Sequence, residues 1–264
     1  MLLTIDVGNT NIEFGVFEGD ALLGTFRLMT RSNQTSDEIG LTVCQYFDRF
    51  GLDREQVEDV IIASVVPGIM YALKRAMIKY LGRKPLVVNE DVFPVLGFLG
   101  KATTNDLGAD RSVACVAAME KYGLPLIVLD FGTATTVDAV DKNGVYVGGS
   151  ICPGLRVSMD ALAQNAAMLP HVNLDLPDTV LGYDTITQIQ AGVVGGYVGS
   201  MEYLIRRTKA EMEEPDEDIK VIATGGLSHL IAGHTGAIDA VDSELIPEGL
   251  AGIYRKYRAA NSDK

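Results

Sequence analysis

Two short segments of the chain share a pattern of residues suited to binding phosphate. The first runs from Asp6 to Asn11 and reads DVGNTN, and the second runs from Asp130 to Thr136 and reads DFGTATT. The glycine allows a tight turn and close approach of the backbone to a ligand. Turn N–H groups can point at phosphate oxygens, and a carboxylate at a strand end can hold a metal ion with its waters. Two such turns in two similar halves predict a nucleotide held in a cleft between them.

A third candidate is the segment Gly108-Ala109-Asp110-Arg111, at the predicted start of a helix. An aspartate there is commonly an N-cap or a first-turn acid. Beside a nucleotide, the same carboxylate could accept the proton of an attacking hydroxyl, as the catalytic carboxylates of kinases do. Arg111 could bind a carboxylate or phosphate through its planar guanidinium group, or form a surface ion pair.

The common nucleotide-binding motifs are missing from the sequence. It contains neither GxxxxGK[ST] nor GxGxxG, so neither a P-loop nor a dinucleotide-binding turn is predicted. The run Thr224-Gly225-Gly226 follows a short apolar segment, which fits close approach of the backbone to an adenosine and equally a tight turn. The prediction of phosphate binding therefore depends on the two aspartate turns.

Composition narrows the class of protein. The 264 residues are 47% hydrophobic, and no apolar run approaches the roughly 20 residues of a membrane span. The net charge of −13 argues against a nucleic-acid or anionic-membrane surface. Three scattered cysteines and three scattered histidines predict neither a disulfide framework nor a zinc site. We expect a cytoplasmic protein with no membrane or nucleic-acid partner.

The elements that must position these residues follow from hydrophobic spacing and turn signals. Strands are expected at 2–5, 13–17, 22–27, 60–65, 85–88, 126–129, 135–140, 145–151 and 221–223. Helices are expected at 36–50, from Pro67-Gly68 to about 81, at 109–122, from Pro153-Gly154 onward, at 187–207 and at 247–257, with 91–107 as a loop. Three strands in a meander followed by alternating helices and strands, twice, predict an α/β fold with one mixed sheet in each half.

The expected long helix carries Ala191, Gly195 and Gly199 at four-residue spacing. Such a row predicts one flat face. Small residues mark close approach without naming the partner, so the face fits helix packing inside one subunit or a homodimer contact.

Taken in order, five motifs resemble those of the type III pantothenate kinases along nearly the whole chain. They are DVGNT at 6–10, GADR at 108–111, DFGTATT at 130–136, GGSICPG at 148–154 and ATGG at 223–226. The resemblance implies two ribonuclease-H-like domains of the actin-like and sugar-kinase ATPase superfamily, residues 1–118 and 119–264, with an interdomain nucleotide cleft. It implies ATP-dependent phosphorylation of pantothenate to 4′-phosphopantothenate, the first step of coenzyme A biosynthesis. It also implies a homodimer, ATP with Mg²⁺ or a similar divalent cation, and a monovalent cation, K⁺ or NH₄⁺.

The resemblance assigns a role to each matching residue. Asp110 would be the general base and would line the pantothenate site with Gly108, Ala109, Arg111 and Thr185. Thr185 also precedes a predicted helix, where a cap is the alternative role. Asp130 would bind the monovalent cation and Thr133 the ATP phosphates. ATP would also contact the first turn through Asp6, Val7, Gly8, Asn9, Thr10, Asn11, Ile12 and Glu13, with Asp6 near the magnesium.

One segment departs from the family pattern. Many members carry an aromatic residue that contacts pantothenate, followed by Asn-Pro, shortly before Gly-Ala-Asp-Arg. Here Lys101 stands near the place of that aromatic residue, and Phe98 is the nearest aromatic substitute. Two alternatives therefore stay open: a kinase for another small hydroxy acid, and a non-catalytic nucleotide-binding regulator of the same fold. Intact Asp6, Asp110 and Asp130 favour the kinase.

Overall fold

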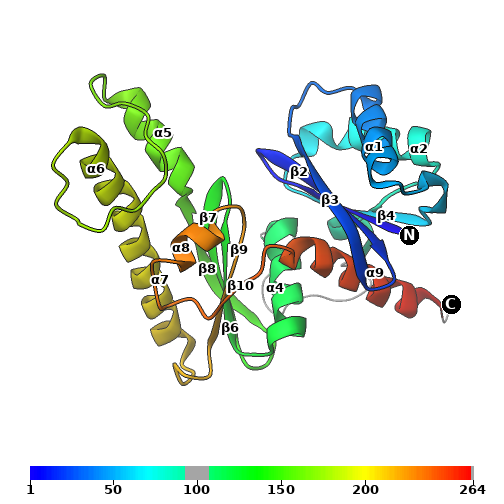
Figure 1. The fold of residues 1–264 in the computed structure, drawn as a ribbon. Helices are drawn as coiled ribbons and strands as arrows, with labels where there is room; N and C mark the ends of the chain where they lie inside the picture. Colours follow the sequence, from blue (N-terminus) through cyan, green and yellow to red (C-terminus); the bar gives the residue numbers. More distant parts are fainter. Residues whose placement is uncertain (93–106, 263–264) are drawn as a thin grey trace. The chain divides into compact units, whose positions relative to one another are not determined.

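The computed structural model describes residues 1–92 and 107–262, and within them the chain forms two compact units (Figure 1). Unit 1 comprises Met1–Ala117 together with the C-terminal segment from Glu244, and unit 2 comprises Ala118–Ser243. Each unit contains a five-stranded mixed sheet with helices packed on it. No helix among the described residues is both long enough and apolar enough to cross a membrane.

The sheet of unit 1 has the strand order β3-β2-β1-β4-β5. Strand β1 (Leu2–Val7) pairs antiparallel with β2 (Asn11–Glu18), and β2 pairs antiparallel with β3 (Ala21–Met29). On its other side β1 runs parallel to β4 (Asp59–Ser64), which runs parallel to β5 (Leu86–Val87). This register places Asp6 opposite Glu13 on β2 and Ala63 on β4.

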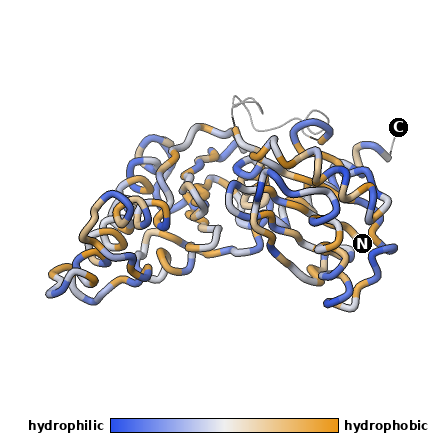
Figure 2. The backbone as a smooth tube through the Cα atoms, turned by 90° about the horizontal axis from the view of Figure 1, so that it is seen from above, coloured by the Kyte–Doolittle hydropathy of each residue, from blue (hydrophilic) through white to orange (hydrophobic). Residues whose placement is uncertain are grey.

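Helices cover both faces of this sheet because successive strand residues point to opposite faces. On one face, Leu3, Ile5 and Phe14 pack against α1 (Ser36–Phe50) and α2 (Met70–Leu81). On the other, Leu2 and Ile61 pack against the start of α4 (Ala109–Tyr122) and against α9 (Leu245–Ser262). Figure 2 shows hydrophobic and hydrophilic stretches interleaved along the chain, as expected where each element has one buried face.

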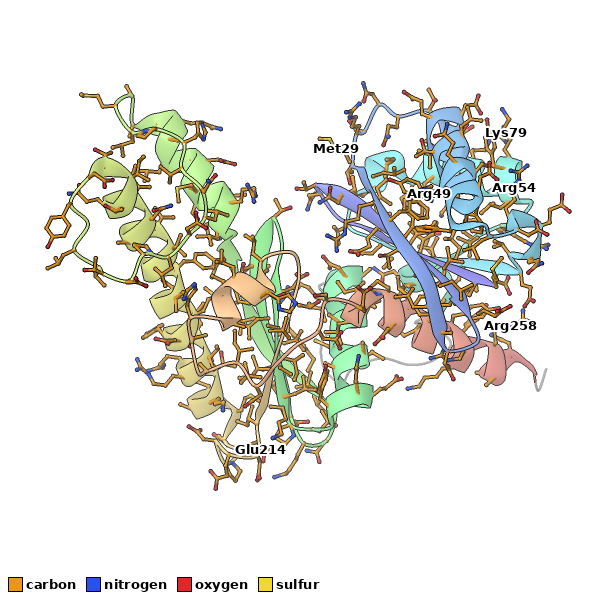
Figure 3. The ribbon with its side chains drawn as sticks, in the orientation of Figure 1. Met29, Arg49, Arg54, Lys79, Glu214 and Arg258 are labelled. Atoms are coloured by element: carbon orange, nitrogen blue, oxygen red, sulfur yellow. The ribbon has the colours of Figure 1, made fainter. Side chains whose placement is uncertain are left out.

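Short helical segments and surface ion pairs complete unit 1. The segments are η1 (Arg54–Gln56), η2 (Pro67–Ile69) and the π-turn η3 (Val88–Val92). Helix α1 begins with a capping box, in which Thr35 and Glu38 bond to each other's backbone N–H groups. Lys79, which lies on the outer surface in Figure 3, ties α2 to α1 through Asp37, 2.7 Å away.

The sheet of unit 2 repeats the plan of unit 1, with the order β8-β7-β6-β9-β10. Strand β6 (Leu126–Phe131) pairs antiparallel with β7 (Ala134–Val140), which pairs antiparallel with β8 (Tyr146–Pro153). On its other side β6 runs parallel to β9 (Lys220–Thr224), and β9 to β10 (Ala240–Val241). Strand for strand, β6 thus takes the place of β1, and Asp130 that of Asp6. The prediction of one mixed sheet in each half is confirmed.

Five helical segments pack in or around unit 2: α5 (Leu155–Asn165), α6 (Thr185–Gln190), the π-turn η4 (Ala191–Gly195), α7 (Gly196–Met212) and α8 (Ser228–Ala232). The single long helix expected at 187–207 is therefore interrupted by a π-turn. The three small residues expected on one flat face differ in exposure: Ala191 is buried in the core, whereas Gly199 is exposed and a Cβ added there would touch nothing within 4 Å. The role of this row in helix packing or in a homodimer stays a prediction.

Candidate functional site

The first aspartate turn joins β1 to β2 and leaves its polar residues accessible. Within the turn, the Gly8 N–H donates to the Asn11 carbonyl at 3.0 Å, while Thr30 Oγ1 donates to the Gly8 carbonyl at 2.7 Å. The first bond closes the turn itself, and the second ties it to Thr30, the residue that follows β3. Asn9, Thr10 and Asn11 are exposed, as a ligand-binding turn requires. Glu13, opposite Asp6, accepts from Arg27 at 2.8 Å.

The second aspartate turn joins β6 to β7 and is tighter. The Gly132 N–H donates to the Ala134 carbonyl at 3.1 Å, and the Gly154 N–H donates to the Thr133 carbonyl at 3.0 Å. A Cβ at Gly154 would stand 2.4 Å from the Thr133 oxygen, so only glycine lets the start of α5 close on this turn. The Thr133 side chain is exposed.

Asp130 sits at the end of β6 against a glycine of the third predicted motif. It pairs in register with Thr136 on β7 and Thr224 on β9. Gly225, the residue after β9, has φ +88° and leaves no room for a side chain beside the Asp130 carboxylate. Asp130 and Thr224-Gly225 are therefore neighbours, which links the second aspartate turn to the run expected to approach an adenosine.

In unit 1, Asp110 lies at the carboxyl edge of the parallel strands. It is the second residue of α4, and its Oδ1 accepts from the Arg111 backbone N–H at 2.7 Å. A Cβ at Gly108 would stand 2.6 Å from this Oδ1 and 3.4 Å from Val65 Cγ1. Val65 directly follows β4 and donates to the Val7 carbonyl at 3.1 Å. Asp110 thus lies near the strand ends where the first aspartate turn begins, the edge at which ligands bind in open α/β sheets.

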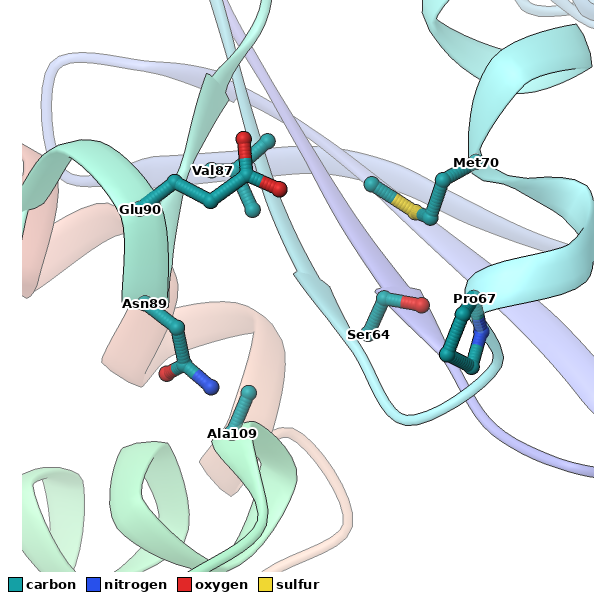
Figure 4. Close-up of a pocket in the computed structure, with 7 residues that line it drawn as sticks. All are labelled: Ser64, Pro67, Met70, Val87, Asn89, Glu90 and Ala109. Atoms are coloured by element: carbon teal, nitrogen blue, oxygen red, sulfur yellow. The ribbon is translucent and has the colours of Figure 1, made fainter. Parts of the chain in front are cut away.

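A cavity of about 270 Å³ opens beside this edge (Figure 4). Its lining is mixed, with apolar groups next to a hydroxyl, an amide and a carboxylate. Glu90 is held by Lys74 at 2.9 Å. The lining residues come from the ends of β4 and β5, from η2 and η3, and from the starts of α2 and α4: Ser64, Pro67, Met70, Val87, Asn89, Glu90 and Ala109.

Thr185 is exposed and is the first residue of α6 in unit 2. Asp184, not Thr185, is the N-cap, and it forms a capping box with Thr187. The structure therefore assigns the capping role to the neighbouring residue. The candidate residues are divided between the two units: Asp6–Glu13 and Gly108–Arg111 belong to unit 1, and Asp130, Thr133 and Thr185 to unit 2.

Two further expectations concern the loop before Asp110 and the binding of a metal ion. Lys101, Phe98 and most of the loop expected at 91–107 lie outside the described residues. Within residues 1–92 and 107–262, His, Cys, Asp and Glu form no group of three suited to a metal ion. A single carboxylate beside backbone oxygens is instead the kind of donor set that hard cations take with water or substrate phosphate.

Sequence reasoning missed two buried residues that brace unit 2. Tyr197 on α7 hydrogen-bonds the Thr135 hydroxyl next to the second turn. Asp242, 7% exposed, accepts from Tyr122 at 2.9 Å and from Lys121 at 2.8 Å. These contacts join residues far apart in sequence, and no local spacing signals them.

Comparison with known proteins identifies a family. A family model of type III pantothenate kinases matches residues 2–207. A type III pantothenate kinase of Agathobacter rectalis is 44% identical over 258 residues, which is 97% of this chain and 97% of that protein. The motifs on which the sequence resemblance rested therefore lie within a match that covers almost the full length.

Solved structures match the fold. A Campylobacter jejuni protein described provisionally as a conserved Baf family transcriptional activator is 21% identical, with a TM-score of 0.60 over 96% of this chain and 98% of its own. A Sinorhizobium meliloti protein described provisionally as a 2-dehydro-3-deoxygalactonokinase is 12% identical, with a TM-score of 0.60 over 97% and 99%. At such identities the likeness concerns fold alone, and it confirms the predicted two-domain α/β fold.

Proposed function

This chain belongs to the type III pantothenate kinase family, whose reaction is the ATP-dependent phosphorylation of pantothenate in coenzyme A synthesis, and we propose how its residues divide that work. The observation that carries the proposal is the position of Asp110. Its carboxylate lies near the ends of β1 and β4, beside the first aspartate turn and the cavity lined by Ala109. An acceptor hydroxyl in that cavity would meet a base and a phosphate-binding turn together.

We assign the triphosphate to the two aspartate turns. In unit 1 the contacts come from the segment Asp6–Glu13, and in unit 2 from Thr133. The Gly8 and Gly132 turns are closed by their own backbone bonds, so their shape is set before a ligand arrives. Preorganised N–H groups and hydroxyls stabilise the charge that spreads over the transferred phosphoryl group. A divalent cation, bound with ATP and held near Asp6, would neutralise charge on the phosphate oxygens.

Asp110 acts as the general base in this assignment. The primary hydroxyl of pantothenate attacks the γ-phosphorus, the bond to the β,γ-bridging oxygen breaks, and ADP leaves. The hydroxyl proton goes to the Asp110 carboxylate. The Arg111 N–H bond at 2.7 Å and the N-terminal end of α4 hold this carboxylate in place. Positioning and electrostatics supply most of the acceleration in such a reaction.

The cavity of unit 1 suits the acid substrate in both size and chemistry. The apolar groups of Pro67, Met70 and Val87 fit the dimethyl group of pantothenate, and Ser64 and Asn89 can bond its amide and hydroxyl groups. Gly108 and Arg111 adjoin this cavity through Ala109 and Asp110. Thr185 would complete the site as the family resemblance implies.

A monovalent cation, K⁺ or NH₄⁺, is assigned to Asp130. The fit rests on the carboxylate of Asp130 and the nearby carbonyl oxygens of the 132–133 turn, which are hard oxygen donors. Such an ion would supply positive charge next to the ATP phosphates. We expect Asp130→Asn to weaken activation by potassium. Unchanged potassium activation in that variant would count against this assignment.

A homodimer is supported by apolar side chains that unit 2 exposes between α5 and α6. Met168 is 94% exposed and Tyr183 is 96% exposed, and Val180, Leu181 and Ile186 are also exposed. Large apolar side chains exposed along one segment, from Met168 to Ile186 at the start of α6, are typical of an interaction surface. The same segment contains Thr185, so a second copy bound there would lie next to a candidate substrate residue. We also place the enzyme in the cytoplasm, where ATP is the usual phosphoryl donor.

The test is pantothenate-dependent release of ADP with Mg²⁺, with and without K⁺ or NH₄⁺. We expect turnover that needs both pantothenate and the monovalent cation. Asp110→Asn should keep the fold and ATP binding but lower kcat by about 10²-fold or more, as loss of a general base does. Near-normal turnover in this variant would remove Asp110 from its role.

The open alternatives give different results in the same assay. A kinase for another small hydroxy acid would release ADP only when a different acceptor from a panel replaces pantothenate. A non-catalytic regulator would bind ATP without releasing ADP for any acceptor.

A further inference from the structure

Tyr197 is a buried phenol whose hydroxyl points at the base of the second aspartate turn. The hydroxyl donates toward two acceptors, the Thr135 hydroxyl and the Pro153 carbonyl 3.3 Å away. Thr135 is the second residue of β7, and Pro153 is the last residue of β8. One side chain on α7 thus joins β7, the strand that leaves the turn, to its antiparallel neighbour β8.

Strand β7 leaves the turn that presents Thr133, and the end of β8 packs against that turn. Ala134 pairs in register with Pro153, and the next residue, Gly154, donates to the Thr133 carbonyl at 3.0 Å. Gly154 touches the Gly132 and Thr133 carbonyls so closely that no side chain would fit. A shift of Pro153 or Thr135 would therefore move Thr133, because Gly154 bonds to the Thr133 carbonyl and Pro153 pairs with Ala134, the residue between Thr133 and Thr135.

An irregular turn of helix directly precedes Tyr197. The π-turn Ala191–Gly195 ends two residues before it, and such turns are rare and often occur at functional sites. Val194 in this turn is buried, and so are Tyr197, Val198 and Met201 on the helix that follows it. Burial raises the pKa of the Tyr197 phenol, so the hydroxyl keeps its hydrogen and remains a donor at neutral pH.

We propose that Tyr197 is a positioning residue for ATP: by holding Thr135 and Pro153, it fixes the turn from which Thr133 meets the phosphates. The proposal rests on the proposed function, in which Thr133 binds ATP phosphate. Tyr197 itself touches neither the nucleotide nor the acceptor. Its effect should therefore appear in the binding of the phosphate chain and not in the binding of pantothenate or of the adenosine end.

The central experiment compares Tyr197→Phe with a matched control, Tyr203→Phe, which removes a hydroxyl from an exposed tyrosine on the same helix. For Tyr197→Phe we expect kcat/KM for ATP to fall about 3- to 10-fold, the effect of one hydrogen bond. The KM for pantothenate and the Kd for AMP should stay within about twofold of wild type. Tyr203→Phe should leave all three constants unchanged.

A second pair of variants tests the contact from its other side. Thr135→Val removes the hydroxyl but keeps the branched shape, and should reproduce the loss seen in Tyr197→Phe. Thr135→Ser keeps a hydroxyl and should restore most of the ATP kcat/KM. Combined with Thr135→Val, Tyr197→Phe should add only the smaller loss that comes from its longer contact with the Pro153 carbonyl, since both variants break the Tyr197–Thr135 bond. If Tyr197→Phe does not fold, the Thr135 pair decides the matter alone.

Two results would overturn the inference. One is an unchanged kcat/KM for ATP in well-folded Tyr197→Phe or Thr135→Val. The other is a parallel loss of AMP, ATP and pantothenate binding, which a general structural role would give. Thr133→Ala distinguishes failure of the positioning role from failure of the proposed function. If Thr133→Ala weakens ATP binding while Tyr197→Phe does not, only the positioning role of Tyr197 fails. If Thr133→Ala leaves ATP binding unchanged, the phosphate assignment itself fails.

Discussion

Gly225 and Asp130 touch so closely that a Cβ at position 225 would stand 2.3 Å from the Asp130 Oδ1 atom. The same Cβ would stand 2.7 Å from the Phe131 backbone, and Gly225 has φ +88°, where a side chain is strained. Asp130, near the end of β6, is thus packed against Gly225, which directly follows the parallel strand β9. This contact joins Asp130, the assigned cation ligand, directly to the run Thr224-Gly225-Gly226 that is expected to approach the adenosine.

Gly225→Ala should therefore disturb both stability and nucleotide binding. Overpacking and left-handed strain together should lower the free energy of unfolding by about 2–4 kcal/mol. Displacement of Asp130 should also weaken potassium activation. Chemical denaturation measures the first effect and ADP release against potassium concentration measures the second. The control is Gly236→Ala, where an added Cβ meets nothing within 4 Å. Equal stability of the two variants would contradict the prediction.

Ala109→Val should weaken pantothenate binding specifically. Ala109 lines the cavity of unit 1, so two added methyl groups would take space proposed for the substrate. We expect the KM for pantothenate to rise about 3- to 10-fold, with the KM for ATP little changed. Ala114→Val is the matched control, because Ala114 is buried on the same helix but does not line the cavity. Equal effects of both variants on the pantothenate KM would argue against this cavity.

Leu181→Glu should shift the protein from dimer to monomer. Leu181 is 79% exposed within the apolar segment between α5 and α6, and a buried unpaired charge in an interface is strongly unfavourable. Light scattering during size-exclusion chromatography would show the change in mass. Tyr71→Glu, on the exposed surface of α2, should leave the mass unchanged. A dimeric Leu181→Glu protein would place the interface elsewhere.

Tyr254→Phe should flatten the loss of stability at high pH. Burial, together with a hydrogen bond to Asp59, raises the pKa of Tyr254 on α9 to about 12, whereas a free phenol has a pKa of about 10. The folded chain therefore holds this proton to higher pH, and the associated stability is complete below about pH 10 and lost by about pH 12. Arg258, labelled in Figure 3, lies 3.7 Å from the same Asp59 oxygen.

The measurement is Tm between pH 9 and 12 for wild type and Tyr254→Phe. The two proteins differ only in this hydroxyl, so the difference in slope isolates Tyr254. Parallel curves would show that this phenol does not contribute.

Local signals were sufficient for both aspartate turns and for the strands of the two sheets except β10 (Ala240–Val241), which was not predicted. Apolar runs such as 126–129 end at Asp130 and a glycine, and the meander that follows appears in both units as predicted. Gly154 was predicted to open a helix, and α5 begins at Leu155. These features depend on residues within a few positions of one another, where glycine, proline and alternation have direct physical effects.

Other features depend on partners far apart in sequence. The π-turn at 191–195 has the same small and apolar residues as an ordinary helix, so the spacing of Ala191, Gly195 and Gly199 gave no sign of it. Tyr197 has a role only because Thr135 lies beneath it, and nothing near Tyr197 in sequence specifies that contact. Thr185 was considered as a helix cap from sequence, and only the backbone geometry shows that the neighbouring Asp184 is the N-cap.

The packing of α9 on the first sheet has a consequence for biosynthesis on the ribosome. Leu250, Ala251 and Ile253 close one face of a core whose strands were translated before all of unit 2. While unit 2 is made and folds, the growing chain must therefore carry an apolar sheet face, including Leu2 and Ile61, that the start of α4 can cover only in part. Nascent chains arrested before residue 245 should thus bind trigger-factor-like chaperones through the first unit, even when the second is already native.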